Sequence, residues 1–127
     1  MGGVTYDTGA LVAAERNNRR MWALHAGYLA EEVIPTVPAA VLAQSWRGGS
    51  RQASLSRLLR MCDTEPMSED LAKVVGVLAG KSGHGDIVDV SVVEGAVSRG
   101  DAVVTSNASH IAAIAEAAGA RLRIESI

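Results

Sequence analysis

The chain has 127 residues, a formal net charge of -2 and one cysteine, and it contains no Phe. This length suits a single domain, spanning 1–127, that buries about two-thirds of the surface of its unfolded form in an aliphatic core. One cysteine excludes an internal disulfide and agrees with a reducing, cytoplasmic compartment, and no apolar run approaches the ~18 residues that cross a membrane.

The N-terminal half alternates β-prone runs with helical spacing of apolar residues. We expect Thr8 to cap the first helix and Pro35 to mark the end or the edge of a strand. Pro38 suits the first turn of a helix, which Gly48–Gly49 should end. The expected elements are strands at 4–7 and 33–37, and helices at 8–15, 19–32, 38–46 and 51–60.

The C-terminal half continues this alternation. Ser68 is a good N-cap for a helix that should stop near Gly80, and Arg99–Gly100 is typical of a helix C-terminus. The expected elements are helices at 68–79, 86–99 and 109–118, and strands at 62–66, 102–105 and 122–125. Alternating strands and helices predict an α/β fold with a mainly parallel sheet.

Two polar residues lie at the carboxyl ends of predicted strands: Asp7 ends the strand at 4–7, and Asn107 comes just after the strand at 102–105. Ligands of open parallel sheets bind beyond the carboxyl ends of the strands. We therefore expect Asp7 and Asn107 at the same edge of the sheet, which is the candidate binding edge.

Two further carboxylates, Asp86 and Asp89, lie in the aliphatic segment "GDIVDVSVVEGAV" of residues 85–97. On a helix this i, i+3 pair shares one face. Two interpretations stay open. Asp86 could be an N-cap, with Asp89 as the acid of a capping box. Alternatively, both acids join Asp7 and hold Mg²⁺ or Mn²⁺, since three gathered carboxylates repel each other unless a cation neutralises them.

The segment from Val33 to Cys62 contains four arginines and no Asp or Glu. Arg47 and Arg51, one helical turn apart, are candidate contacts to the phosphates of a nucleic acid or to an acidic partner. We expect Trp46 to pack between helices and Cys62 to be a core residue, not a nucleophile. The three histidines are scattered, without the spacing of zinc ligands.

Four stretches resemble PIN-domain proteins in their order along the chain. They are "TYDTGALVAAE" at 5–15, "VPAAVLAQSWRGG" at 37–49, "DIVDVSVVEGAV" at 86–97 and "DAVVTSN" at 101–107. Within that family the whole chain resembles the VapC-type toxins of bacterial toxin–antitoxin pairs. The resemblance implies a PIN-like three-layer α/β domain, with a mainly parallel sheet of four or five strands flanked by helices. It also implies an endoribonuclease that hydrolyses RNA phosphodiester bonds with Mg²⁺ or Mn²⁺.

The resemblance also assigns the acidic site. The first acid of the family falls on Asp7 and the third on Asp89, with Asp86 as an additional acid one turn earlier. These three residues are the expected metal ligands, and Asn107 joins them as a catalytic residue.

The chain departs from the family at three positions. Gln44 stands where the family has a Glu, Asn107 where it has a fourth acid, and His110 where a further acid is frequent. Amide oxygens can bind a metal but carry no charge, so we expect weaker metal affinity. Gln44 is a possible outer ligand, and Thr8 or Ser106 could orient water or phosphate.

The resemblance implies two protein partners, a second copy of the chain in a homodimer and an antitoxin lying over the helices near Trp22 and Trp46. Gln44 and Asn107 also motivate an alternative from another class: a degenerate PIN domain that binds RNA or a partner without cleaving. A third interpretation is an interaction module in which the acids are only helix caps.

Overall fold

The sheet of this protein has five strands, all parallel, in the order β3-β2-β1-β4-β5. The computed structural model describes residues 2–127. The strands are β1 (Val4–Tyr6), β2 (Thr36–Pro38), β3 (Asp63–Glu65), β4 (Ala102–Thr105) and β5 (Ile124–Ser126). Because all neighbours are parallel, every strand has its carboxyl end at the same edge. The expected α/β fold is confirmed.

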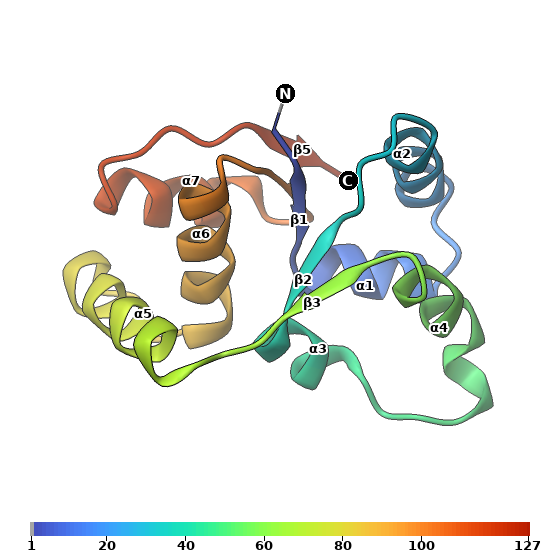
Figure 1. The fold of residues 1–127 in the computed structure, drawn as a ribbon, viewed down its shortest axis with the longest axis horizontal. Helices are drawn as coiled ribbons and strands as arrows, with labels where there is room; N and C mark the ends of the chain where they lie inside the picture. Colours follow the sequence, from blue (N-terminus) through green and yellow to red (C-terminus); the bar gives the residue numbers. More distant parts are fainter. Residues whose placement is uncertain (1) are drawn as a thin grey trace.

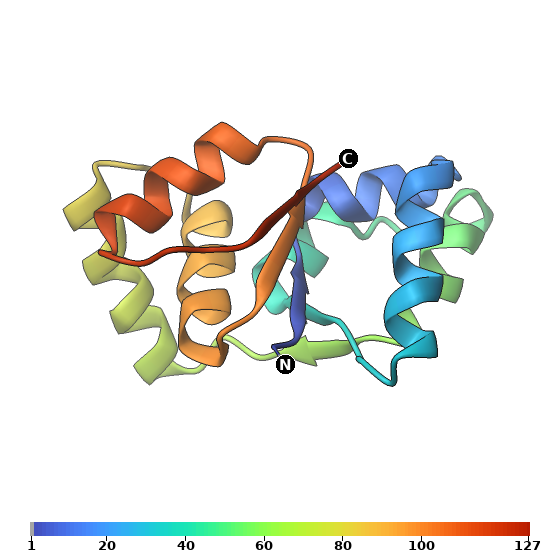
Figure 2. The ribbon, with the colours of Figure 1, turned by 90° about the horizontal axis from the view of Figure 1, so that it is seen from above.

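Helices cover both faces of the sheet, which gives three layers (Figures 1 and 2). The helices are α1 (Thr8–Glu15), α2 (Arg19–Ala30), α3 (Ala39–Ser45), α4 (Ala53–Leu59), α5 (Glu69–Ser82), α6 (Ile87–Arg99) and α7 (Ala108–Ala117). Helices α1, α2 and α4 lie on one side of the sheet, and α5, α6 and α7 lie on the other. Helix α3 contacts both α1 and α6, so it joins the two layers.

Side-chain caps begin several of these helices. Asp7, and not the expected Thr8, caps α1, with Asp7 Oδ1 accepting the Ala10 N–H at 2.9 Å. The Thr8 hydroxyl instead donates to Gln44. Ser68 caps α5 as expected, accepting the N–H of Leu71 at 3.1 Å.

Several predicted boundaries were wrong. Strand β2 covers Thr36–Pro38 and not the predicted 33–37. Pro35 lies just before it, at the end of a strand as expected, although the strand is inside the sheet. At this place Pro35 needs no N–H, and its carbonyl accepts the Asp63 N–H at 2.9 Å. Helix α3 ends at Ser45, before Gly48–Gly49, and a 3-10 turn at Ser50–Gln52 precedes α4. Helix α5 continues through Gly80 and ends at Ser82, where Gly83 takes a positive φ of 72°.

The core is aliphatic and lies between the sheet and the helices. Its buried side chains come mainly from β1, β4, α1 and α6. It also contains a buried polar pair, in which the Tyr6 hydroxyl lies 2.8 Å from His25 Nδ1. Burial lowers the pKa of His25, so this imidazole is neutral at neutral pH.

Arg99, the last residue of α6, ties this helix to three parts of the sheet. Its guanidinium forms an ion pair with Glu65 of β3, bonds Asp101 Oδ2 at 2.9 Å just before β4, and donates to Thr5 Oγ1 of β1 at 2.9 Å. Thr5 in turn donates to Asp101 at 2.8 Å. Gly95 makes room for this network, since a Cβ at this position would lie 2.8 Å from Glu65 Oε1 and 2.9 Å from Arg99 Nη2.

Two glycine replacements should therefore have opposite effects on stability. Ala is favoured over Gly inside a helix by about 0.5–1 kcal/mol. Gly76→Ala in α5 should raise the free energy of unfolding by that amount, because a Cβ there would have nothing within 4 Å. Gly95→Ala should not show this rise in the free energy of unfolding, because its methyl group would displace the Glu65–Arg99 ion pair. Urea denaturation measures both variants, and equal gains would show that the network does not depend on Gly95.

Candidate active site

Four elements bring polar side chains to the carboxyl edge of the sheet. Asp7 follows β1, and its N–H donates to Val104 of the neighbouring β4 at 3.2 Å. Asn107 lies two residues beyond β4, so both residues lie at the predicted edge. Asp89 lies in the first turn of α6, and Gln44 lies near the end of α3. Both helices pack against strands β1 or β2, which brings these four residues toward one another.

Asp7 is the most buried of these groups, with 5% of its surface exposed. Burial raises the pKa of its carboxyl, and the negative charge of Asp89 raises the pKa further. Hydrogen bonds from the Thr105 side chain and the Ala10 N–H lower the pKa but do not cancel the rise. Asp7 is therefore a carboxylate held in position by its helix cap, in surroundings that penalise its charge.

Asp89 is half-buried and faces α7. Its Oδ2 lies 2.9 Å from His110 Nε2. Burial raises the pKa of Asp89, the neighbouring Asp86 raises it further, and His110 lowers it. Both Asp7 and Asp89 thus have raised pKa values, and each lies where a nearby positive charge would be stabilising.

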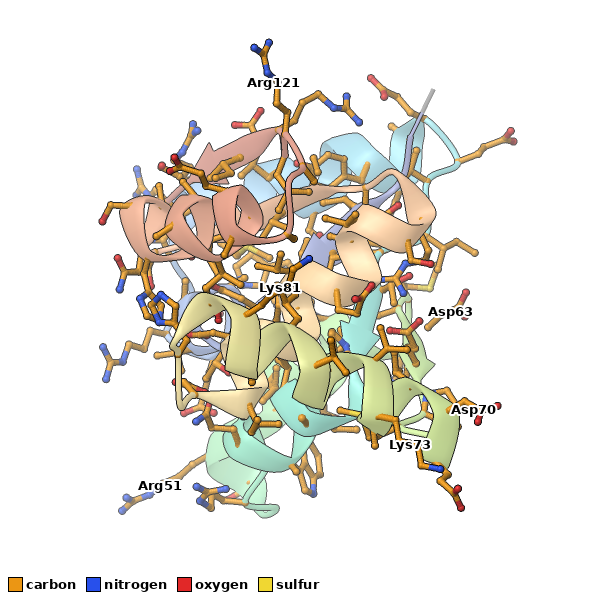
Figure 3. The ribbon with its side chains drawn as sticks, turned by 90° about the vertical axis from the view of Figure 1, so that its left-hand side faces the viewer. Arg51, Asp63, Asp70, Lys73, Lys81 and Arg121 are labelled. Carbon is orange, nitrogen blue, oxygen red and sulfur yellow. The ribbon has the colours of Figure 1, made fainter. Side chains whose placement is uncertain are left out.

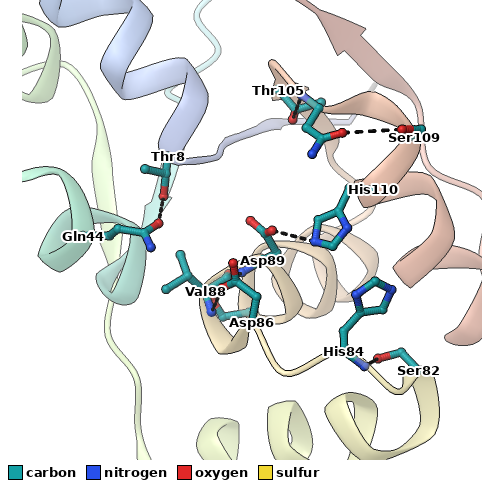
Figure 4. Close-up of polar contacts among 12 residues, drawn as sticks. Thr8, Gln44, Ser82, His84, Asp86, Val88, Asp89, Thr105, Ser109 and His110 are labelled. Atoms are coloured by element: carbon teal, nitrogen blue, oxygen red, sulfur yellow. Dashed lines mark hydrogen bonds and ion pairs between the residues drawn. The ribbon is translucent and has the colours of Figure 1, made fainter.

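Asp86 is exposed and caps α6, with its Oδ1 accepting the N–H groups of Val88 at 3.0 Å and Asp89 at 3.3 Å (Figure 4). The helix-cap interpretation of Asp86 is confirmed. A role for Asp86 as a metal ligand stays a prediction.

The two neutral residues at the site, Gln44 and Asn107, have different hydrogen-bond partners. Thr8 Oγ1 donates to Gln44 Oε1 at 2.5 Å, and Figure 4 shows this pair across from Asp89 and His110. Asn107 is exposed, its N–H donates to Thr105 Oγ1 at 2.9 Å, and its Oδ1 lies 3.5 Å from the hydroxyl of Ser109.

A pair of histidines lies beside Asp89, and sequence reasoning did not bring the two together. The rings of His84 and His110 are 4.6 Å apart at their centroids and meet edge to face. His84 belongs to the turn between α5 and α6, whereas His110 belongs to α7. Only the packing of these helices joins them, so no local spacing could have signalled the pair.

The predicted arginine pair is not on one helix, because α3 ends before it. Arg47 follows α3 and donates to the carbonyl of Trp46 at 2.7 Å, while Arg51 lies in the 3-10 turn and extends outward (Figure 3). Trp46 was expected to pack between helices but is 41% exposed. It lines an apolar cavity of about 260 Å³ with Leu42 and Leu59.

Cys62 is half-buried, and its thiol lies 3.4 Å from the carbonyl of Leu58. Burial raises the pKa of this thiol to about 12. The thiol is therefore protonated at neutral pH, which supports a packing role and not a nucleophilic one.

The donor set bears on which metal could bind here. Within residues 2–127, no three His, Cys, Asp or Glu side chains form a group that could hold a metal ion. The site offers two carboxylates, Asp7 and Asp89, with amide and hydroxyl oxygens around them. Mg²⁺ uses one or two protein carboxylates and keeps several waters, so these residues fit one hard divalent cation better than a soft metal.

Comparison with known proteins establishes the fold. No protein-family model matches the chain, and no curated protein matches its sequence. A chain in the crystal structure of VapBC2 from Rickettsia felis, bound to a DNA fragment from their promoter, is similar with a TM-score of 0.67 and 17% identity, over 98% of each chain. The fold is therefore PIN-like. Across residues 2–127, no helix combines the length and the apolar character needed to span a membrane.

Asp7→Asn is expected to stabilise the metal-free protein at neutral pH. A carboxyl whose pKa is raised by folding destabilises the folded state at pH values above its folded pKa, and this cost is absent below its unfolded pKa of about 3.9. Asn caps a helix as well as Asp does, so the substitution removes the charge and keeps the cap. Urea denaturation in EDTA should show a more stable variant at pH 7.5, with a smaller advantage as the pH falls. A variant less stable than wild type at every pH would contradict this.

Proposed function

We propose that this protein is a VapC-type endoribonuclease that hydrolyses RNA phosphodiester bonds with one Mg²⁺ or Mn²⁺ ion. The observation that carries the proposal is that Asp7, directly after β1, and Asp89, in α6, both have raised pKa values, and that the charge of Asp89 reaches Asp7 at the carboxyl edge of a PIN-like sheet. A bound cation would offset the cost of burying these two charges and the effect of the Asp89 charge on Asp7. The similarity to a chain of VapBC2 and the ordered motifs support the same class.

In this proposal each side chain has a distinct task. Asp7 and Asp89 hold the metal ion, which when bound lowers the pKa of a coordinated water and offsets the charge of the phosphate. The helix-cap bond from the Ala10 N–H holds Asp7 in position, and His110 holds Asp89. The hydroxyls of Thr8 and Ser106 are near enough to this edge to orient the phosphate or water.

RNA cleavage by three charge-removing variants tests the metal ligands. Asp7→Asn and Asp89→Asn should each lower the rate of Mn²⁺-dependent cleavage on the order of 100-fold or more, since a metal ion contributes several kcal/mol to such reactions. Asp86→Asn is the matched control, because Asn preserves the helix cap. A wild-type rate in Asp7→Asn or Asp89→Asn would overturn the assignment. A loss in Asp86→Asn as large as theirs would make Asp86 a third ligand.

Gln44→Glu should strengthen Mn²⁺ binding on the order of tenfold, because the affinity of an oxygen site rises with the number of charged ligands. Gln44 Oε1 already accepts from Thr8 at the site, and Glu keeps that oxygen. Isothermal titration calorimetry of the two proteins measures the change. Equal affinities would mean that position 44 lies outside the ligand sphere of the metal.

A second candidate function is a non-cleaving module that binds RNA or a protein partner. It is favoured by the neutral Gln44 and Asn107, and by the lack of a three-ligand group among residues 2–127. The two functions differ in one measurement, the calorimetric titration of the purified protein with Mn²⁺. Saturable micromolar binding that Asp89→Asn abolishes favours the nuclease, and no binding favours the module.

We also propose an antitoxin as a partner, on the helices near Trp22 and Trp46. Trp46 is the more available of the two, because it lines the apolar cavity with Leu42 and Leu59. Trp22 is half-buried beneath Arg57, whose guanidinium carbon lies 4.6 Å from the ring centroid. The homodimer rests on the resemblance alone, and analytical ultracentrifugation of the purified chain tests it.

A further inference from the structure

A groove of about 510 Å³ opens beside the candidate active site. Thr8 and Ser106 line its near end, and these residues are the chain neighbours of Asp7 and Asn107. The groove follows helix α1 away from the carboxyl edge of the sheet and reaches Arg16 at the far end of the helix. Its near end therefore lies next to the candidate active site.

The near end of the groove depends on Gly9. A Cβ at this position would lie 2.1 Å from Ser106 Oγ and 3.2 Å from the Ser106 backbone nitrogen. Only a glycine lets the first turn of α1 approach the segment after β4 this closely. Thr8 and Ser106, on the two segments that meet here, both line the near end of the groove.

The chemistry of the groove changes along its length. Hydroxyl groups line the near end, the apolar side chains of Val12, Ala13 and Ile127 line the middle, and the exposed Arg16 stands at the far end. No Asp or Glu lines it. Among residues 2–127 Arg16 forms no ion pair, whereas the nearby Arg20 is paired with Glu125 at 3.4 Å. This order suits an extended nucleic-acid strand. The hydroxyl groups could contact one phosphate, the apolar side chains the sugar and base, and the cation of Arg16 the next phosphates.

We propose that this groove binds single-stranded RNA next to the scissile phosphate, with Arg16 contacting a phosphate that flanks the cleavage site. Helix α1 has 8 residues, which span about 12 Å at 1.5 Å per residue. The groove volume lies within the ~300–1,000 Å³ of small-ligand sites, so it takes a short stretch of one strand and not a duplex. This inference rests on the proposed nuclease function, because it names the substrate path to that same site.

Fluorescence anisotropy with a 5′-fluorescein-labelled single-stranded RNA decamer of mixed sequence tests the groove. EDTA is present throughout, so metal-dependent cleavage cannot occur and binding is measured alone. Arg16→Ala should weaken binding on the order of fivefold at low salt. It should also reduce the slope of log Kd against log salt by about 0.7, the value for one phosphate contact on a single strand. Arg16→Lys should restore most of the slope, because it keeps the charge.

Arg19→Ala is the matched control, since Arg19 is exposed and lies three residues away but does not line the groove. It should leave the affinity and the salt slope nearly unchanged. Equal losses of RNA affinity in Arg16→Ala and Arg19→Ala would overturn the proposal that RNA binds in the groove and would indicate a diffuse positive surface. Amide chemical shifts in the NMR spectrum provide a second measurement. Adding the RNA should change the amide shifts of Gly9, Val12 and Ser106. Changes confined to the segment around Arg51 would overturn the proposal that RNA binds in the groove.

The outcomes separate this inference from the nuclease proposal. If the wild type cleaves RNA with Mn²⁺ while Arg16→Ala binds the decamer normally, RNA does not bind in the groove, and the nuclease proposal is retained. If Arg16→Ala weakens binding but the wild type shows no cleavage with Mn²⁺ or Mg²⁺, the proposal of RNA binding in the groove is supported and the nuclease proposal is rejected.

Discussion

Arg99 holds the acidic helix of this protein in place on the sheet. Its guanidinium reaches Glu65, Asp101 and Thr5, so the C-terminal end of α6 is tied to β3, to the start of β4 and to β1. The other end of the same helix carries Asp89 to the carboxyl edge. Because α6 is fixed at one end by several charged hydrogen bonds, the position of Asp89 relative to the strands is defined. The convergence of carboxylates at the site therefore depends on a polar network at the far end of the helix.

The parallel sheet explains why part of the site could be predicted from the sequence. Asp7 and Asn107 each follow a strand, and parallel strands bring their carboxyl ends to one edge. Helix starts with strong local signals, such as Ser68 and Asp86, were also predictable. The end of α3 was not, because just after Ser45 the side chain of Gln52 bonds the Ser45 carbonyl and the N–H groups of Arg47 and Gly48, and this contact comes from a later segment.

Contacts between distant segments could not be predicted in the same way. The edge-to-face rings of His84 and His110, and the hydrogen bond between Thr8 and Gln44, join elements that no local pattern relates. The groove toward Arg16 likewise exists only once α1 packs beside the segment after β4. Periodicity identifies the faces of helices, whereas these features depend on how the layers meet. The resemblance to a family supplied the order of the motifs but not these contacts.

The site combines two carboxylates, Asp7 and Asp89, whose charged forms are costly in the folded state, with the neutral amides of Gln44 and Asn107. This arrangement should bind one divalent ion between Asp7 and Asp89, and that single ion is the central claim about function. Crystals soaked in MnCl₂ and measured at the manganese absorption edge test it most directly. We predict one anomalous difference peak at the carboxylates of Asp7 and Asp89. A map without a peak there, from crystals that show ordered Asp7 and Asp89 side chains, would contradict the claim.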